Sequence, residues 1–225
     1  MKTPLTFLFL FSGSVYGGDE DDLQEGWDAY DRKDYKTTLR LWLPLAEQGN
    51  AEAQVLLGMM YSNGTGVTQD YKEAVKWYRL SAEQGNASAQ SNLGLMYDNG
   101  TGVPQDYKEA VKWYRLSAKQ DDAIAQFNLG ALYETGQGVP QDYKEAVKWY
   151  RLSAEQEYEL AQFNLGLMYA QGTGVPQDDV SAHMWLNLCG SNGYKDAVKN
   201  RDIIEKDMSP SQVEKAQEMA RNWKT

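Results

Sequence analysis

The chain has 225 residues, a formal net charge of −10 at pH 7, one cysteine and one histidine. A disulfide framework needs two cysteines and a structural zinc site needs about four Cys or His ligands, so we expect neither, and no cofactor. The acidity disfavours nucleic acid as a partner, because phosphate backbones repel an acidic chain. No apolar run is long enough to span a membrane, although the 42% of hydrophobic residues can build a core.

The first seventeen residues have the order of a secretory signal peptide. Lys2 supplies a positive charge, an apolar stretch runs from Leu5 to Phe11, and small residues follow up to Gly17. This interpretation places cleavage after Gly17 and predicts export to the periplasm or the medium. An ordinary N-terminal start without a targeting role is the alternative. A lone thiol at Cys189 is compatible with export if it is buried.

A period of 36 residues organises most of the remaining chain. The copies at 51–86 and 87–122 are identical at 27 of 36 positions. A shorter, degenerate copy precedes them, in which Gly26 matches Gly58, and the final residues depart from the pattern and are expected to form a helical cap. The predicted segments are 18–50, 51–86, 87–122, 123–158, 159–194 and the cap 195–225.

Each repeat is expected to contain two helices. Apolar residues at helical spacing predict a first helix from about Ala51 to Ser62, and glycines then end it. Asp70 and Glu73 form a capping-box pattern for the second helix. Because a helix pair cannot bury both of its apolar faces alone, stacked neighbours must do so, which predicts an all-α solenoid. The inter-repeat turns at 121–122 and 157–158 lack the Gly-Asn of earlier copies and are less well defined by sequence.

Two side-chain series recur in the second helices. The aromatic series at 36-residue spacing is expected in the core between helices. It consists of Trp77, Trp113 and Trp149 with Tyr78, Tyr114 and Tyr150. The cationic series Lys72, Lys76 and Arg79, with its copies, lies opposite the apolar stripe and is expected on the solvated outer surface.

The pattern A-x-A-Q-x-N-L-G-x-M-Y-x-x-G-x-G-V-P-Q-D-Y-x-x-A-x-x-W-Y-x-x-S-A resembles the Sel-one-like repeat, a relative of the tetratricopeptide repeat with a longer loop. The resemblance runs from Asp19 to the C-terminus, and the first unit is closer to a plain tetratricopeptide unit. It implies an all-α, right-handed α/α superhelical solenoid with a C-terminal helical cap. Because family members act as adaptors, it also implies non-enzymatic binding of a protein or peptide in the concave groove.

The first helices are expected to line that groove. Their outward stripe is the most variable part of the repeats, and it places apolar residues beside an asparagine ladder. An Asn amide can donate to and accept from an extended peptide, or it can instead bond neighbouring helices or loops. The candidate partner-binding residues are Trp27, Tyr30, Val55, Met59, Asn92, Leu95, Phe127, Asn128, Phe163, Asn164 and Leu167.

The sequence offers little for catalysis. His183 and Cys189 are six residues apart in one expected helix, so their side chains point to different faces. The glycine-rich loops carry Pro104 and Asp106 where a phosphate cradle would need bare N–H groups. A cysteine-rich branch of the resembled family is associated with β-lactam hydrolysis, but that branch ties each repeat with a disulfide, and no Ser-x-x-Lys element is present here. We therefore expect no enzyme, with a β-lactamase-like hydrolase and a structural spacer as the alternatives.

The negative charge is unevenly distributed. Residues 19–50 hold nine acids and four bases, which is half of the net charge, whereas the cap at 195–225 is slightly basic. The N-terminal end is therefore expected to prefer a basic partner.

Overall fold

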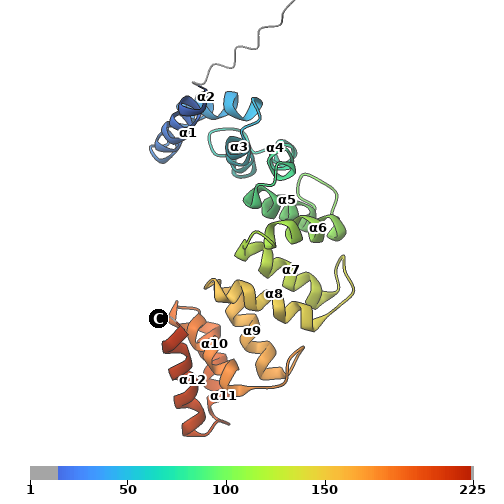
Figure 1. The fold of residues 1–225 in the computed structure, drawn as a ribbon, viewed down its shortest axis with the longest axis vertical. Helices are drawn as coiled ribbons and strands as arrows, with labels where there is room; N and C mark the ends of the chain where they lie inside the picture. The colour runs from blue at the N-terminus through green and yellow to red at the C-terminus, as the bar shows by residue number, and fades with distance from the viewer. Residues whose placement is uncertain (1–14, 224–225) are drawn as a thin grey trace, which may run out of the picture. The chain divides into compact units, whose positions relative to one another are not determined.

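The computed structural model describes residues 15–223, and every secondary-structure element in that range is a helix (Figure 1). The helices are α1 (Val15–Asp31), α2 (Tyr35–Glu47), α3 (Ala51–Asn63), α4 (Tyr71–Glu83), α5 (Ala87–Asn99), α6 (Tyr107–Ala118), α7 (Ala123–Thr135), α8 (Tyr143–Glu155), α9 (Glu159–Gln171), α10 (Asp179–Ser191), α11 (Lys195–Glu205) and α12 (Pro210–Trp223). The predicted all-α class is confirmed. Most of the predicted signal peptide, residues 1–14, lies outside the described residues.

The chain forms two compact units, Met1–Leu80 and Ser81–Thr225, which divide within α4. In the first unit, α2 packs against both α1 and α3. In the second unit, consecutive helices from α5 to α11 pack against one another, and α10 also contacts α12. Helix pairs stacked in chain order define a solenoid of repeats, as the periodicity predicts.

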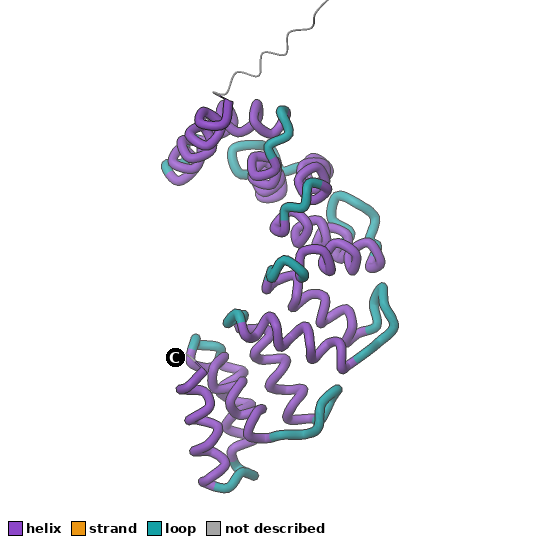
Figure 2. The backbone as a smooth tube through the Cα atoms, in the orientation of Figure 1, coloured by secondary structure: helices purple, strands orange, loops and turns teal. Residues whose placement is uncertain are grey.

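Long loops join the two helices of each repeat between residues 51 and 194, whereas short turns join α1 to α2 and each repeat to the next (Figure 2). Asp106 caps α6, because its carboxylate accepts from the backbone N–H groups of Lys108 and Glu109 at 2.9 and 3.1 Å. The predicted role of the aspartate is therefore confirmed, but the reciprocal bond between Glu109 and the Asp106 N–H does not form. The Asp106 N–H donates to the Tyr97 carbonyl, and the Glu109 carboxylate pairs with Lys112 at 3.1 Å, since this lysine offers a charged partner one turn away.

The two turns without Gly-Asn keep the helix-stop geometry. Asp121 and Glu157 take left-handed backbone conformations, with φ of 61° and 65°, where an earlier copy has Gly85. The Asp122 carboxylate caps α7 through the Ala125 N–H at 2.7 Å. Tyr158 begins α9 with no side-chain cap. The chain course is therefore conserved at the cost of backbone strain in two non-glycine residues.

A glycine on each of the helices α1, α3, α5, α7 and α9 faces a bulky side chain on the second helix of its repeat. A Cβ atom on Gly130 would lie 2.8 Å from the Tyr150 ring, so only glycine allows this approach. Tyr78, Tyr114 and Tyr150 are buried, as are Trp77 and Trp113, whereas Trp149 is half-buried. The prediction that the aromatic series forms the core is confirmed.

The cationic series is only partly solvated. Lys112 is exposed, and its ammonium lies 4.9 Å from the ring centroid of Trp113. Arg115 is half-buried instead, and its guanidinium donates to the Tyr133 hydroxyl of the next repeat at 2.9 Å. The expectation of a free outer surface is thus wrong for this arginine, because a tyrosine of the following repeat lies within its reach.

Helix α12 closes the second unit. A reciprocal capping box starts it, since the Ser209 N–H donates to Gln212 Oε1 at 2.8 Å and the Gln212 N–H donates to Ser209 Oγ at 3.3 Å. Ala216 and Ala220 are buried, as expected for a helix that caps the repeats. Gln217 is exposed, and Met219 packs against the core.

Candidate partner-binding surfaces

In the first unit, the candidate aromatic residues pack against one another. The rings of Trp27 and Tyr30 are half-buried and lie 5.2 and 5.8 Å from the Trp42 ring. Val55, expected on the open side of its helix, is only 7% exposed, because residues on all sides of α3 are buried. Met59 is half-buried. These side chains therefore offer a partner little free apolar surface.

In the second unit, the outward side of the first helices carries exposed apolar residues. We call this surface the first-helix face and define it by Leu95 on α5, Ile124 on α7, Leu160 on α9 and Ile203 on α11. Their exposed fractions are 41, 51, 38 and 51%. Only Leu95 was among the residues expected from sequence. The other three occupy periodic positions; Leu160, for example, follows Ile124 by 36 residues. An alignment of the repeats over these positions could therefore have identified them from the sequence.

The asparagine ladder lies along this face, and Asn92 and Asn164 make internal hydrogen bonds. Asn92 is half-buried, and its amide donates to the Ser88 carbonyl of its own helix at 2.9 Å. Asn164 forms a side-chain hydrogen bond with the Tyr150 hydroxyl. Burial and the Glu134 carboxylate, which accepts a hydrogen bond from that hydroxyl, raise the pKa of Tyr150. Asn128 is also half-buried.

The ladder continues into the cap. Asn200 on α11 stands 36 residues after Asn164 and repeats the bond of Asn92, since its amide donates to the Asp196 carbonyl at 2.8 Å. Helix α11 therefore acts as a further first helix, although its sequence departs from the repeat.

Phe127 and Phe163 are half-buried between elements. The Phe127 ring lies 5.5 Å from the Tyr150 ring and 5.2 Å from the Tyr158 ring, and the Phe163 ring lies 5.1 Å from the Tyr194 ring. Leu167 is likewise half-buried. These half-buried residues pack beneath the first-helix face, and the more exposed Ile124 and Leu160 lie beside them.

The residues that could carry chemistry are engaged elsewhere. Cys189 is fully buried, and its thiol donates to the Glu159 carbonyl at 3.3 Å. Burial and the nearby Glu159 charge raise the pKa of Cys189 to about 11, so the nucleophilic thiolate is scarce at neutral pH. His183 is buried too, with Nε2 3.1 Å from the Glu205 carboxylate. Within residues 15–223, no cluster of His, Cys, Asp or Glu could hold a metal ion, and none of the helices there is long and apolar enough to cross a membrane.

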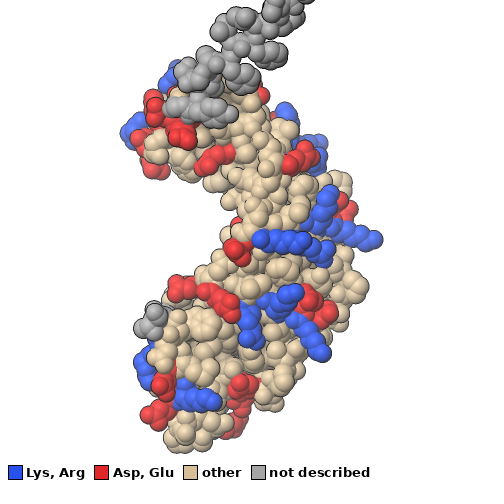
Figure 3. All heavy atoms as spheres, in the orientation of Figure 1, with Lys and Arg blue, Asp and Glu red and all other residues tan. Residues whose placement is uncertain are grey.

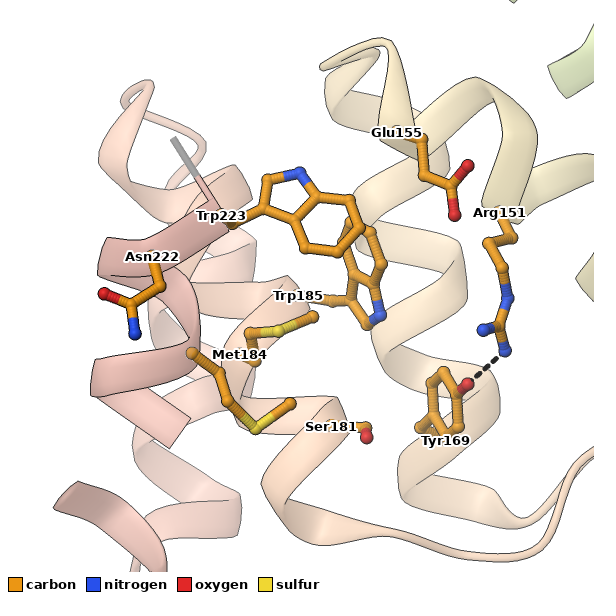
Figure 4. A pocket seen from close by; sticks show the side chains of 9 residues that line it. Arg151, Glu155, Tyr169, Ser181, Met184, Trp185, Asn222 and Trp223 are labelled. Atoms are coloured by element: carbon orange, nitrogen blue, oxygen red, sulfur yellow. Dashed lines mark hydrogen bonds between the residues drawn. The ribbon is translucent and has the colours of Figure 1, made fainter. Parts of the chain in front are cut away.

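A cavity of about 410 Å³ opens between α8, α9, α10 and α12 (Figure 4). The rings of Trp185 and Trp223 meet edge to face inside it, with centroids 4.8 Å apart. The Arg151 guanidinium points toward Tyr169 and donates to its hydroxyl. Sequence reasoning missed this cavity, because its lining comes from four separate helices.

The fold and these surfaces define an all-α solenoid of helix-pair repeats. The model of the Sel1 repeat matches residues 51–86, 87–122, 123–158 and 160–194, which is more than half of the chain. The chain therefore belongs to the Sel1 repeat family, as the repeat pattern predicts. Proteins of this family are scaffolds for protein–protein interactions.

Solved structures agree with this assignment. A Sel1 repeat protein from Oxalobacter formigenes is 39% identical, with a TM-score of 0.72 over 77% of this chain and 72% of that one. A protective antigen of uropathogenic Escherichia coli with an SLR fold is 30% identical, with a TM-score of 0.59; the match covers 93% of this chain and 54% of that one. A Klebsiella pneumoniae protein, 21% identical with a TM-score of 0.55 over 88% and 98% of the two chains, shares the fold. No curated protein matches the chain.

Proposed function

We propose that the protein is a non-enzymatic scaffold that binds another protein or a peptide on the first-helix face. The observation that carries this proposal is the series of exposed apolar side chains on α5, α7, α9 and α11. Exposed apolar side chains that recur on neighbouring elements are typical of interaction sites. Proteins of the Sel1 family act as scaffolds, which favours the same function.

The support beneath this face favours binding with little reordering. Phe127 and Phe163 fix the first helices against aromatic residues of the adjacent elements. Asn92 and Asn200 are held by carbonyl groups of their own helices. A face that is rigid before binding loses less conformational entropy when a partner docks.

The state of the reactive side chains favours binding over catalysis. The Cys189 thiol is buried and donates to a carbonyl, and the imidazole of His183 contacts Glu205. A Cys–His nucleophile pair needs direct contact between the two groups, and here each has another partner.

Export belongs to the same proposal. The leader pattern up to Gly17 and the buried Cys189 thiol support a location in the periplasm or the medium. Mass spectrometry of the protein recovered from fractionated cells is expected to find Gly18 as the first residue. An intact Met1 in the cytosolic fraction would refute export.

The binding proposal is tested with two matched substitutions of similarly exposed leucines. Leu160→Asp places a charge on the first-helix face, whereas Leu116→Asp places it on the second helix α6; the two side chains are 38 and 40% exposed. Affinity capture from an envelope extract, followed by mass spectrometry, identifies the partners of the unmodified chain. We expect Leu160→Asp to lose them and Leu116→Asp to retain them, with unchanged helicity in both. Equal recovery with all three proteins would contradict the proposal.

A further inference from the structure

The cavity between α8, α9, α10 and α12, which we call the cap pocket, has an apolar floor. Met184, Trp185, Met219 and Trp223 line it, and the two tryptophan rings turn toward each other within it (Figure 4). Arg151 comes to its edge from α8. A pocket of this size and composition fits one large apolar side chain.

A second hollow of about 470 Å³ adjoins the cap pocket along α8. Val147, Leu152 and Val175 give it an apolar floor, and Lys144 and Lys148 stand at its edge. Arg151 and Glu155 line both cavities, so the two hollows are neighbours that share these side chains. Together they form a surface that can receive several consecutive side chains of a partner.

The paired hollows are locally cationic on a chain that is acidic overall. Their charged lining residues are Lys144, Lys148, Arg151 and Glu155. Lys148 is also paired with the Glu145 carboxylate at 3.4 Å, so three cations face two carboxylates and the surface keeps one net positive charge. On the face that Figure 3 shows, Lys and Arg side chains gather over α6 and α8, with some Asp and Glu side chains beside them near α8. Because the rest of the chain carries excess negative charge, the electrostatic potential favours binding of an acidic partner at this surface over other parts of the chain.

Arg151 is held ready for an anionic group. Its guanidinium donates to the Tyr169 hydroxyl and lies 5.8 Å from the centroid of that ring. A guanidinium has five N–H donors, so this bond leaves others for a carboxylate. Tryptophan, tyrosine and arginine are also the residues most enriched among those that dominate binding energy at protein interfaces.

We propose that the paired hollows bind an acidic polypeptide segment that carries bulky apolar residues. An apolar side chain enters the cap pocket between Trp185 and Met219, and a neighbouring carboxylate of the segment pairs with Arg151. The floor along Val147 and Val175 receives a second apolar residue. This surface is separate from the first-helix face, so the protein presents two binding surfaces with different chemical preferences.

The test uses the full chain labelled with ¹⁵N and two peptide probes. The acidic probe is acetyl-Asp-Phe-Glu-Leu-Asp-amide, and the charge-reversed probe is acetyl-Lys-Phe-Lys-Leu-Lys-amide. The indole N–H signals of Trp185 and Trp223, assigned through Trp→Phe variants, report occupancy of the cap pocket. We expect the acidic probe to shift both signals in a saturable manner, and the charge-reversed probe to bind at least about tenfold more weakly.

Two variants separate this surface from the first-helix face. Arg151→Glu is expected to weaken the acidic probe by about tenfold or more, and Trp223→Ala is expected to abolish the shift of the Trp185 signal. Leu160→Asp, on the first-helix face, is expected to leave the probe affinity unchanged. Circular dichroism verifies that each variant keeps its helicity. The proposal is overturned if the acidic probe leaves both indole signals unmoved, if both probes bind equally, or if Arg151→Glu binds the acidic probe as the unmodified chain does.

Discussion

Helices α8 and α10 stand one period apart and play the same role in successive repeats, but they cover their tryptophans differently. In α8 the Lys148 ammonium lies 5.4 Å from the ring centroid of Trp149. In α10 the corresponding residue is Met184, and Trp185 instead meets the Trp223 ring of α12. Replacing one lysine by methionine thus turns a face suited to solvent into a face on which a closing helix can dock.

Two other residues of α10 also differ from their counterparts in α8. His183 stands where α8 has Val147, and its imidazole reaches Glu205 at the end of α11. Cys189 stands where α8 has Ser153, and both side chains donate to a carbonyl of the preceding first helix, at 3.3 and 2.7 Å. The last repeat therefore keeps the internal bonds of its predecessors and changes the residues that face the cap.

The largest effect is expected when α10 is given the lysine of the other repeats. Met184 is 4% exposed within the core beneath α12, so Met184→Lys places an ammonium where apolar contacts were. We expect a loss of about 3 kcal/mol in the free energy of unfolding, from burial of an unpaired charge or from release of α12. Urea denaturation followed by circular dichroism measures the loss.

The matched control reverses the exchange in the preceding repeat. Lys148→Met removes a half-exposed ion pair with Glu145 and the contact with Trp149, which together contribute less than about 1 kcal/mol. If the two substitutions cost the same, the lysine-to-methionine exchange does not explain how the cap docks.

The periodic features of this fold could be predicted from the sequence, and its tertiary surfaces could not. The 36-residue period predicts the helix pairs, and Asp70 predicts the cap of its helix, because these depend on residues close in sequence. Val55 was expected on an open face because it lies in the outward stripe of its helix, but burial depends on neighbouring helices. The cap pocket was missed for the same reason, since Arg151 and Trp223 meet only after α12 has folded back.

The close approach between helices gives a second difference between the two repeats. Gly130 faces the rigid ring of Tyr150, whereas Gly166 faces Leu186, and an added Cβ would lie 2.8 Å from either side chain. A leucine can change rotamer and a buried aromatic ring has less freedom. We therefore expect Gly130→Ala to destabilise the protein by about 2 kcal/mol, and Gly166→Ala by about half of that.

Thermal denaturation of the two glycine variants and the unmodified chain measures this difference. The double substitution Gly130→Ala with Tyr150→Leu supplies the control, because it gives repeat 123–158 the leucine partner that repeat 159–194 has at Leu186. The loss of stability from Gly130→Ala is then measured between the double variant and the single variant Tyr150→Leu. We expect this loss to fall toward the loss that Gly166→Ala causes. An equal penalty in the presence of tyrosine and leucine would show that ring rigidity is not the cause.

The smallest effect concerns the exchange of serine for cysteine and depends on pH. Burial and the Glu159 charge raise the pKa of Cys189 from 9.0 to about 11, so the folded state holds this proton more tightly than the unfolded chain. The resulting stability is fully present below pH 9 and is lost as the pH rises from about 9 to about 11. Cys189→Ser restores the residue of α8 and removes this titration. We expect the variant to match the unmodified chain within about 0.5 kcal/mol at pH 7 and to lose about 1 kcal/mol less between pH 8 and pH 10.5. Parallel changes in the two proteins across that range, measured by urea denaturation, would mean that the thiol proton does not contribute to the stability of the last repeat.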